Sequence, residues 1–60
     1  MSGEHEFYLK RAAEARADAE ATKLENVRQR HLRSEAAWKH MAARVAATAK
    51  RRAENDLKRN

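Results

Sequence analysis

The residues of this chain that could bind a metal or move a proton near neutral pH are its three histidines. His5 lies near the start of the chain, whereas His31 and His40 are nine residues apart in its second half. Nine residues along one helix turn a side chain by roughly 180°, so His31 and His40 would point in opposite directions. We therefore expect no metal site, and we interpret His31 as a histidine packed against a neighbouring helix.

Covalent catalysis would depend on a hydroxyl group, because the chain has no cysteine. The candidate nucleophiles are Ser2, Thr22, Ser34 and Thr48. Each would need a base held beside it, and we expect no pocket in so short a helical chain to place a histidine there. The sequence therefore predicts a protein that is not an enzyme and that uses no cofactor. The absence of cysteine is compatible with a reducing cytoplasm.

Binding of anions is the other chemistry that the residue types allow, because the charge is unevenly distributed. Residues 1–26 carry four Lys or Arg against six Asp or Glu, whereas residues 27–60 carry ten against three. Basic side chains of this kind contact phosphates or acidic protein surfaces. No aromatic residue is interleaved for base stacking, so we favour a solvated helix end over nucleic-acid binding. The candidate phosphate contacts are Arg28, Arg30, Arg33, Lys50, Arg51 and Arg52.

Apolar and small residues recur at helical spacing in both halves of the chain. The first stripe consists of Tyr8, Ala12, Ala15, Ala19 and Thr22. The second stripe has the same spacing but is about two residues out of phase, which is roughly 200° around a helix. One straight helix cannot present both stripes to one partner, so we expect two helices. The second stripe consists of Val27, His31, Ser34, Trp38, Met41, Val45 and Thr48.

The predicted fold is an all-α antiparallel hairpin that forms one domain, with a first helix at about residues 4–23, a turn at 24–26 and a longer second helix at about 27–57. Asn26 and Gln29 have the spacing of a helix N-cap with a reciprocal glutamine. A turn there places Ala12 opposite Trp38, a small residue against a large one. The alternative is one continuous helix in a long coiled coil, since no proline or glycine compels a break.

Self-association is expected because large apolar side chains are few. Fourteen of the 60 residues are alanine, and a chain of this length buries only about 60% of its unfolded surface. We expect a dimer that forms a four-helix bundle, and a small interaction or structural module that binds itself or another protein. The alternative is a nucleic-acid-binding accessory protein that uses the basic second helix. The predicted core and self-association residues are Tyr8, Ala12, Val27, His31, Trp38, Met41 and Val45.

A cytoplasmic location without a membrane span is expected, because the chain shows no signal peptide and no apolar run near the roughly 20 residues that a span needs.

Four stretches share their layout with a known group of proteins: residues 7–14, the pair Ala15 and Ala19, residues 26–32 and residues 36–42. In chain order they predict a helix with an aromatic-x-x-x-Ala pattern, a short break, and a second helix that starts with Arg-x-x-x-Leu. A later aromatic residue of that helix is followed by Met-Ala. This layout, over about residues 6–46, resembles that of short alphaproteobacterial hypothetical proteins. The resemblance implies a helical hairpin. It implies no activity, because that group is uncharacterised.

Overall fold

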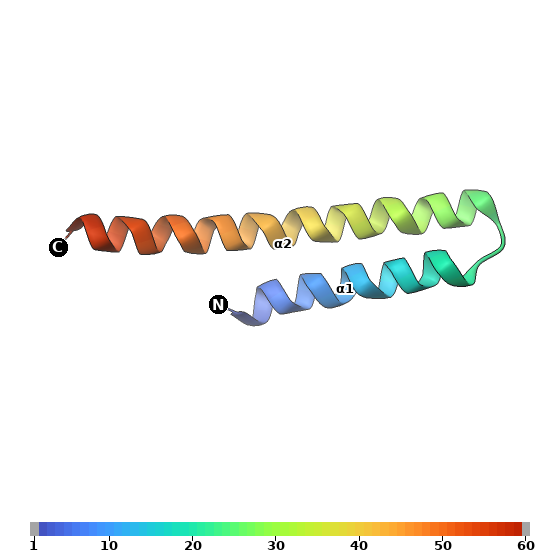
Figure 1. The fold of residues 1–60 in the computed structure, drawn as a ribbon, viewed down its shortest axis with the longest axis horizontal. Helices are drawn as coiled ribbons and strands as arrows, with labels where there is room; N and C mark the ends of the chain where they lie inside the picture. The colour runs from blue at the N-terminus through green and yellow to red at the C-terminus, as the bar shows by residue number, and fades with distance from the viewer. Residues whose placement is uncertain (1, 60) are drawn as a thin grey trace.

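The chain folds as two antiparallel helices of unequal length. This computed structural model describes the backbone of residues 2–59 and the side chains of residues 3–58. Helix α1 spans Ser2–Ala21 and helix α2 spans Glu25–Arg59, with 20 and 35 residues. The two lie side by side, and α2 runs on past the start of α1 (Figure 1). The predicted all-α hairpin with a longer second helix is confirmed, and the continuous helix is wrong.

Helix formation follows from the residue types, since both segments are rich in Ala, Arg, Lys and Glu and contain no proline. The resulting molecule is a rod with extents of 55 × 16 × 10 Å. A membrane-crossing helix is not found among the described residues, because neither α1 nor α2 is apolar enough over a sufficient length.

The connection between the helices, residues 22–24, is closed by short-range hydrogen bonds. The backbone amide of Leu24 donates to Oγ1 of Thr22 over 3.2 Å. The Leu24 carbonyl then accepts the amide of Arg28 over 2.9 Å, which begins the helical bonding of α2. The Arg28 guanidinium donates back to the Thr22 carbonyl over 3.3 Å. Thr22 and Arg28 thus satisfy backbone groups that helix ends leave without a partner.

The predicted turn at 24–26 lies two residues too late, and both helices begin two residues earlier than expected. Asn26 does not cap α2, because it already belongs to the first helical turn. Gln29 donates from Nε2 to Oε2 of Glu25 over 2.8 Å instead. Glu25 is favourable at this position because a carboxylate complements the positive end of the helix dipole.

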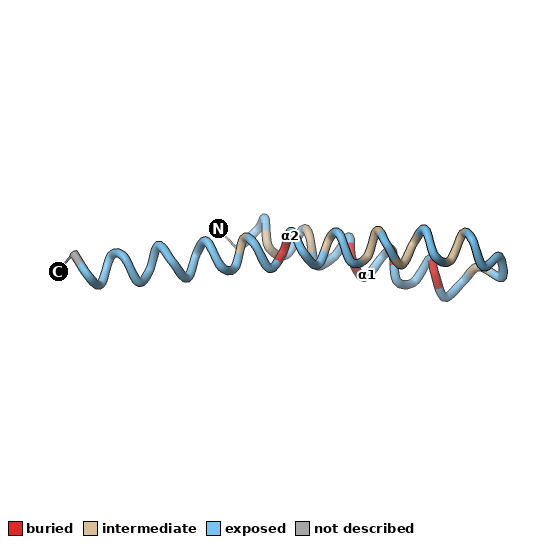
Figure 2. The backbone as a smooth tube through the Cα atoms, turned by 90° about the horizontal axis from the view of Figure 1, so that it is seen from above, coloured by how far each residue is buried: buried red, intermediate tan, exposed pale blue. Residues whose placement is uncertain are grey.

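Four alanines form the buried core between the helices. Among the described side chains, Ala12, Ala15 and Ala19 of α1 and Ala42 of α2 are buried. They lie along the stretch where the helices overlap, whereas α2 is exposed towards its C-terminus (Figure 2). Small side chains allow two helices to approach closely. The first predicted stripe is therefore confirmed in its three alanines.

The second predicted stripe is only partly correct. Trp38 and Val45 are half-buried as expected, but Met41 is 38% exposed while its neighbour Ala42 is buried. Helix α2 is thus rotated by about 50° from the predicted orientation, half the angle between neighbouring residues. The physical reason is that close contact with the alanines of α1 needs another alanine, so Ala42 faces α1 and the bulkier Met41 lies at its flank.

Candidate functional site

An aromatic cluster joins the two helices near the middle of α2. The rings of Tyr8 and Trp38 are stacked with centroids 5.9 Å apart. Phe7 meets Trp38 edge-on at 6.1 Å and meets Tyr8 at 5.7 Å. These are the separations at which aromatic pairs attract beyond the area that they bury. Trp38 therefore anchors α2 to the N-terminal half of α1.

A cation covers one side of the same tryptophan. The guanidinium carbon of Arg11 lies 5.4 Å from the Trp38 ring centroid, within the range of a cation–π contact. Arg11 also donates to Glu14 over 3.2 Å. Both groups are solvent-exposed, so this pair orients the guanidinium more than it stabilises the fold.

Much of this cluster remains uncovered. Phe7 is 53% exposed, and Met41 of α2, which is 38% exposed, lines a groove together with Tyr8 of the cluster. We define the aromatic face as Phe7, Tyr8, Trp38, Met41 and Val45. Isolated exposed apolar residues are common on proteins, but a contiguous group of this kind is typical of an interaction surface.

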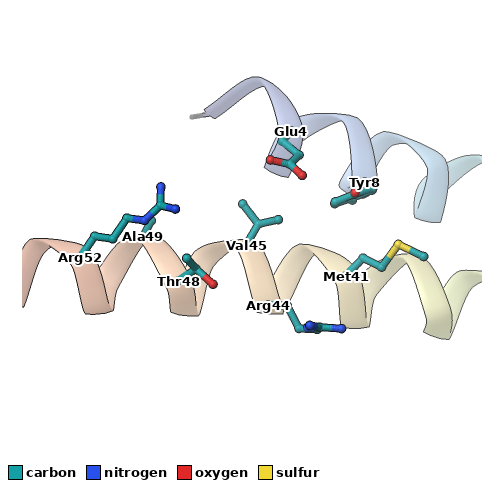
Figure 3. A pocket seen from close by; sticks show the side chains of 8 residues that line it. All are labelled: Glu4, Tyr8, Met41, Arg44, Val45, Thr48, Ala49 and Arg52. Carbon is teal, nitrogen blue, oxygen red and sulfur yellow. The ribbon is translucent and has the colours of Figure 1, made fainter.

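A groove continues the aromatic face past the start of α1. Its volume is about 390 Å³, and Tyr8, Met41 and Val45 form its apolar part. Glu4 contributes from α1, while Arg52 reaches over Ala49 from α2 (Figure 3). The groove is open, and Glu4, Thr48 and Arg52 contribute its polar side chains.

Ion pairs connect the two helices on the flank of the hairpin opposite to the aromatic face. Arg16 contacts Glu20 at 3.2 Å within α1 and Glu35 at 3.5 Å across the interface. Lys39 contacts the second oxygen of Glu35 at 3.2 Å. Glu35 is therefore shared by two cations, and its side chain is only 12% exposed. We define the ion-paired face as Arg16, Glu20, Glu35 and Lys39.

The ion-paired face raises the pKa of Arg16 above its ordinary value. The hydrogen bond with Glu20 is the largest cause, followed by the charge of Glu35. Because the folded-state pKa is raised, this contribution to stability is present in full below the unfolded-state pKa, and it is lost only as the pH rises through the folded-state value. Arg16 therefore gives the protein no pH switch near neutrality.

The predicted phosphate contacts do not lie on one surface. Arg28 is half-buried and turned towards Thr22 and Glu25, so it is not a free cation. Arg52 belongs to the groove, and Lys50 lies about 160° from it around α2. Arg30, Arg33 and Arg51 share the side of α2 that faces away from α1.

The structure assigns different environments to the predicted core and self-association residues. Ala12 lies between the helices and is inaccessible to a partner. Val27 and His31 are half-buried along the interhelical contact, whereas His40 is exposed. Within the described part of the chain, no three His, Asp or Glu side chains come together as a metal site.

Phe7 and Glu35 lie outside both apolar stripes of the sequence, although each contacts the opposite helix. Phe7 completes the aromatic cluster, and the signal that could have found it is the Phe-Tyr pair on one side of a helix opposite a tryptophan. Glu35 pairs with Lys39 at the i, i+4 spacing, which is visible in the sequence. Its contact with Arg16 depends on the register between the helices.

Comparison of the chain with protein-family models, with curated proteins and with solved structures finds no match. The resemblance to short alphaproteobacterial hypothetical proteins therefore stays an expectation.

Proposed function

We propose that this chain is a small non-enzymatic interaction module that acts through self-association, with a second copy covering the aromatic face to form a four-helix bundle. The observation that supports the proposal is the composition of the core. The described core contains alanine alone, while Phe7 and Met41 are exposed. A cytoplasmic location is part of the proposal and agrees with the lack of cysteine.

The accessible surface area of the hairpin is larger than expected for a compact monomer of its mass. One chain of 6.9 kDa exposes 5117 Å². A compact monomer of this mass is expected to expose roughly 4,000 Å². The excess of about 1,100 Å² is similar to the roughly 800 Å² that each partner buries in a standard interface. A second copy could therefore bring the hairpin to the compactness of an ordinary small protein.

The aromatic face is a better surface for this contact than the opposite flank. It groups three aromatic rings with Met41 and Val45, and aromatic residues and methionine are enriched in interfaces. The ion-paired face already uses its charges within the hairpin, at Arg16, Glu35 and Lys39. Covering those charges would remove water from them without adding a partner.

A pair of matched variants tests which face is used. Phe7 and Leu9 are exposed residues of α1, at 53% and 45%, and they point to opposite flanks because two residues turn a helix by roughly 200°. We expect Phe7→Asp to weaken dimerisation at least about tenfold, because the new carboxylate would be buried without a partner. Leu9→Asp should leave the dimer constant within about twofold. Sedimentation equilibrium of both variants measures this.

The same two variants can also contradict the proposal that the aromatic face forms the dimer interface. Equal weakening by both substitutions, or a stronger effect of Leu9→Asp, would contradict the aromatic face as the dimer interface. Circular dichroism of each variant at high protein concentration serves as the control that α1 and α2 remain helical.

A further inference from the structure

One side of α2 carries a row of cations along nearly its whole length. Arg30, Arg44, Arg51 and Lys58 are separated by seven or fourteen residues, and because seven residues fall about 20° short of two turns, they form a row that winds by about 80° around α2 from Arg30 to Lys58. Arg33 and His40 lie one turn from this line. From residue 30 to residue 58 the row covers about 42 Å. We define the outer stripe as Arg30, Arg33, His40, Arg44, Arg51 and Lys58.

The outer stripe faces away from α1. The side of α2 that contacts α1 is marked by Ala42, which is buried, and by Glu35, which is paired with Arg16. The stripe residues lie on the opposite side of the helix, and all are exposed. Arg44 is also one of the residues that line the groove, but its side chain extends from α2 on the side away from α1 (Figure 3).

The charge of the outer stripe is not neutralised within the hairpin. In the described part of the chain, the cations of the ion pairs are Arg11, Arg16, Arg28 and Lys39, so no stripe residue takes part. Among the described residues, Glu54 lies beside the stripe, three residues after Arg51 and four before Lys58, but it forms no ion pair with either. Glu35 is turned towards α1, and Asp56 is fourteen residues from Ala42 and therefore on the inward side.

The spacing and the small residues of the stripe fit a duplex better than a single strand. Ala37 and Ala47 separate the cations, so the helix backbone can approach a surface closely between them. The stripe has no aromatic ring on which unpaired bases could stack. An α-helix of about 10–12 Å diameter fits the major groove of B-form DNA, which is about 12 Å wide, but not the narrow major groove of A-form RNA.

We propose that the outer stripe binds duplex DNA by contacts to its phosphates, with α2 lying in or along the major groove. The contacts would be independent of base sequence, because they are made by cations to the backbone. Self-association through the aromatic face is not required for a single stripe to bind. The inference thus goes beyond the interaction module proposed above. A failure of DNA binding would leave the proposed self-association intact.

Binding of the full chain to a labelled 20-base-pair duplex, measured by fluorescence anisotropy at 50 and 200 mM salt, tests the proposal. If four to five phosphates are contacted, the slope of log affinity against log salt should be about −4, and affinity should fall by about 300-fold between the two salt concentrations. A duplex of unrelated sequence should bind equally, because the contacts carry no base information.

A matched pair of double variants distinguishes an effect of the outer stripe from an effect of net charge. Arg44→Gln with Arg51→Gln removes two stripe cations, and the salt slope should become shallower by about two. Lys50→Gln with Arg52→Gln removes the same charge from the same segment, but off the stripe, and should leave the slope nearly unchanged. Circular dichroism verifies that both variants remain helical.

Three results would overturn the proposal. The first is no duplex binding at 50 mM salt, and the second is an equal change of slope in both double variants, which would reduce the effect to net charge. The third is equal or tighter binding to vesicles containing phosphatidylserine or to polyglutamate, which would assign the stripe to a membrane surface or an acidic protein.

Discussion

Replacing Trp38 with alanine is expected to destabilise the protein by about 3 kcal/mol or more, enough to unfold most of a marginally stable small domain. Trp38 holds Phe7 and Tyr8 of α1 against α2 and lies beneath the guanidinium of Arg11. No other described side chain joins the helices through so many contacts of this kind. Thermal and urea unfolding followed by circular dichroism, at one fixed protein concentration, measure the loss.

Trp38→Phe is the control for this prediction. Phenylalanine keeps a ring next to Tyr8 and Phe7, so it should restore a large part of the stability that alanine loses. A Trp38→Ala protein that remains as helical, as stable and as associated as the original chain would contradict the role of Trp38 as the anchor of the hairpin.

Replacing Ala19 with leucine is expected to have the second largest effect, a destabilisation of about 1–3 kcal/mol. Ala19 is only 1% exposed, and a leucine there would press against Arg28 and Leu32 of α2, which line an open hollow together with Ala19. Leucine would have to push α2 away and would weaken the neighbouring contacts of Ala15. Urea unfolding of the variant gives the free energy directly.

Ala17→Leu provides the matched control, because Ala17 lies on the exposed side of the same helix. The same substitution there should change stability by less than about 0.5 kcal/mol. If leucine at position 19 were tolerated as well as leucine at position 17, the alanine core would not set the distance between α1 and α2.

The inner side of α1 was predictable because alanine at positions 12, 15 and 19 follows one helical line, and the structure buries all three. The corresponding side of α2 was not. Apolar bulk favoured Met41, but the close approach of two helices requires a small residue, which is Ala42. The sequence contains both residues side by side, and only the distance between the helices decides which of them faces α1.

The position of the turn illustrates a similar limit. Thr22 and Asn26 are both good residues for a helix boundary, because each side chain can bond a backbone group. In the structure the hydroxyl of Thr22 and the carbonyl of Leu24 make those bonds, so α2 begins at Glu25. Residue preference predicted the boundary at Asn26, whereas the hydrogen bonds place it two residues earlier.

The grouping of charged and apolar residues into faces could not be predicted from the sequence. Arg28, Arg30 and Arg33 are near neighbours in sequence, but Arg28 is turned towards Thr22 while the other two face away from α1. The exposed state of Phe7 likewise depends on how α1 and α2 are rotated against each other. Charge and hydrophobicity can be counted from a sequence, but their grouping into faces requires the interhelical register.

Self-association through the aromatic face and DNA binding by the outer stripe are independent, but a dimer would strengthen DNA binding. A dimer formed through the aromatic face would carry two outer stripes on one particle, because each copy contributes its own α2. Two linked binding surfaces raise the apparent affinity for a long polyanion when both can be engaged at once. Duplexes long enough for both stripes should therefore bind a dimer more tightly than short ones.

The mass of the unmodified protein in solution tests the central claim most directly. Sedimentation equilibrium over a wide range of protein concentrations should show a transition from one chain of 6.9 kDa to a particle of twice that mass, with stability rising as the dimer forms. A fully helical and cooperatively folding protein that stays at 6.9 kDa at every concentration would contradict self-association. The aromatic face would then need a partner other than a second copy.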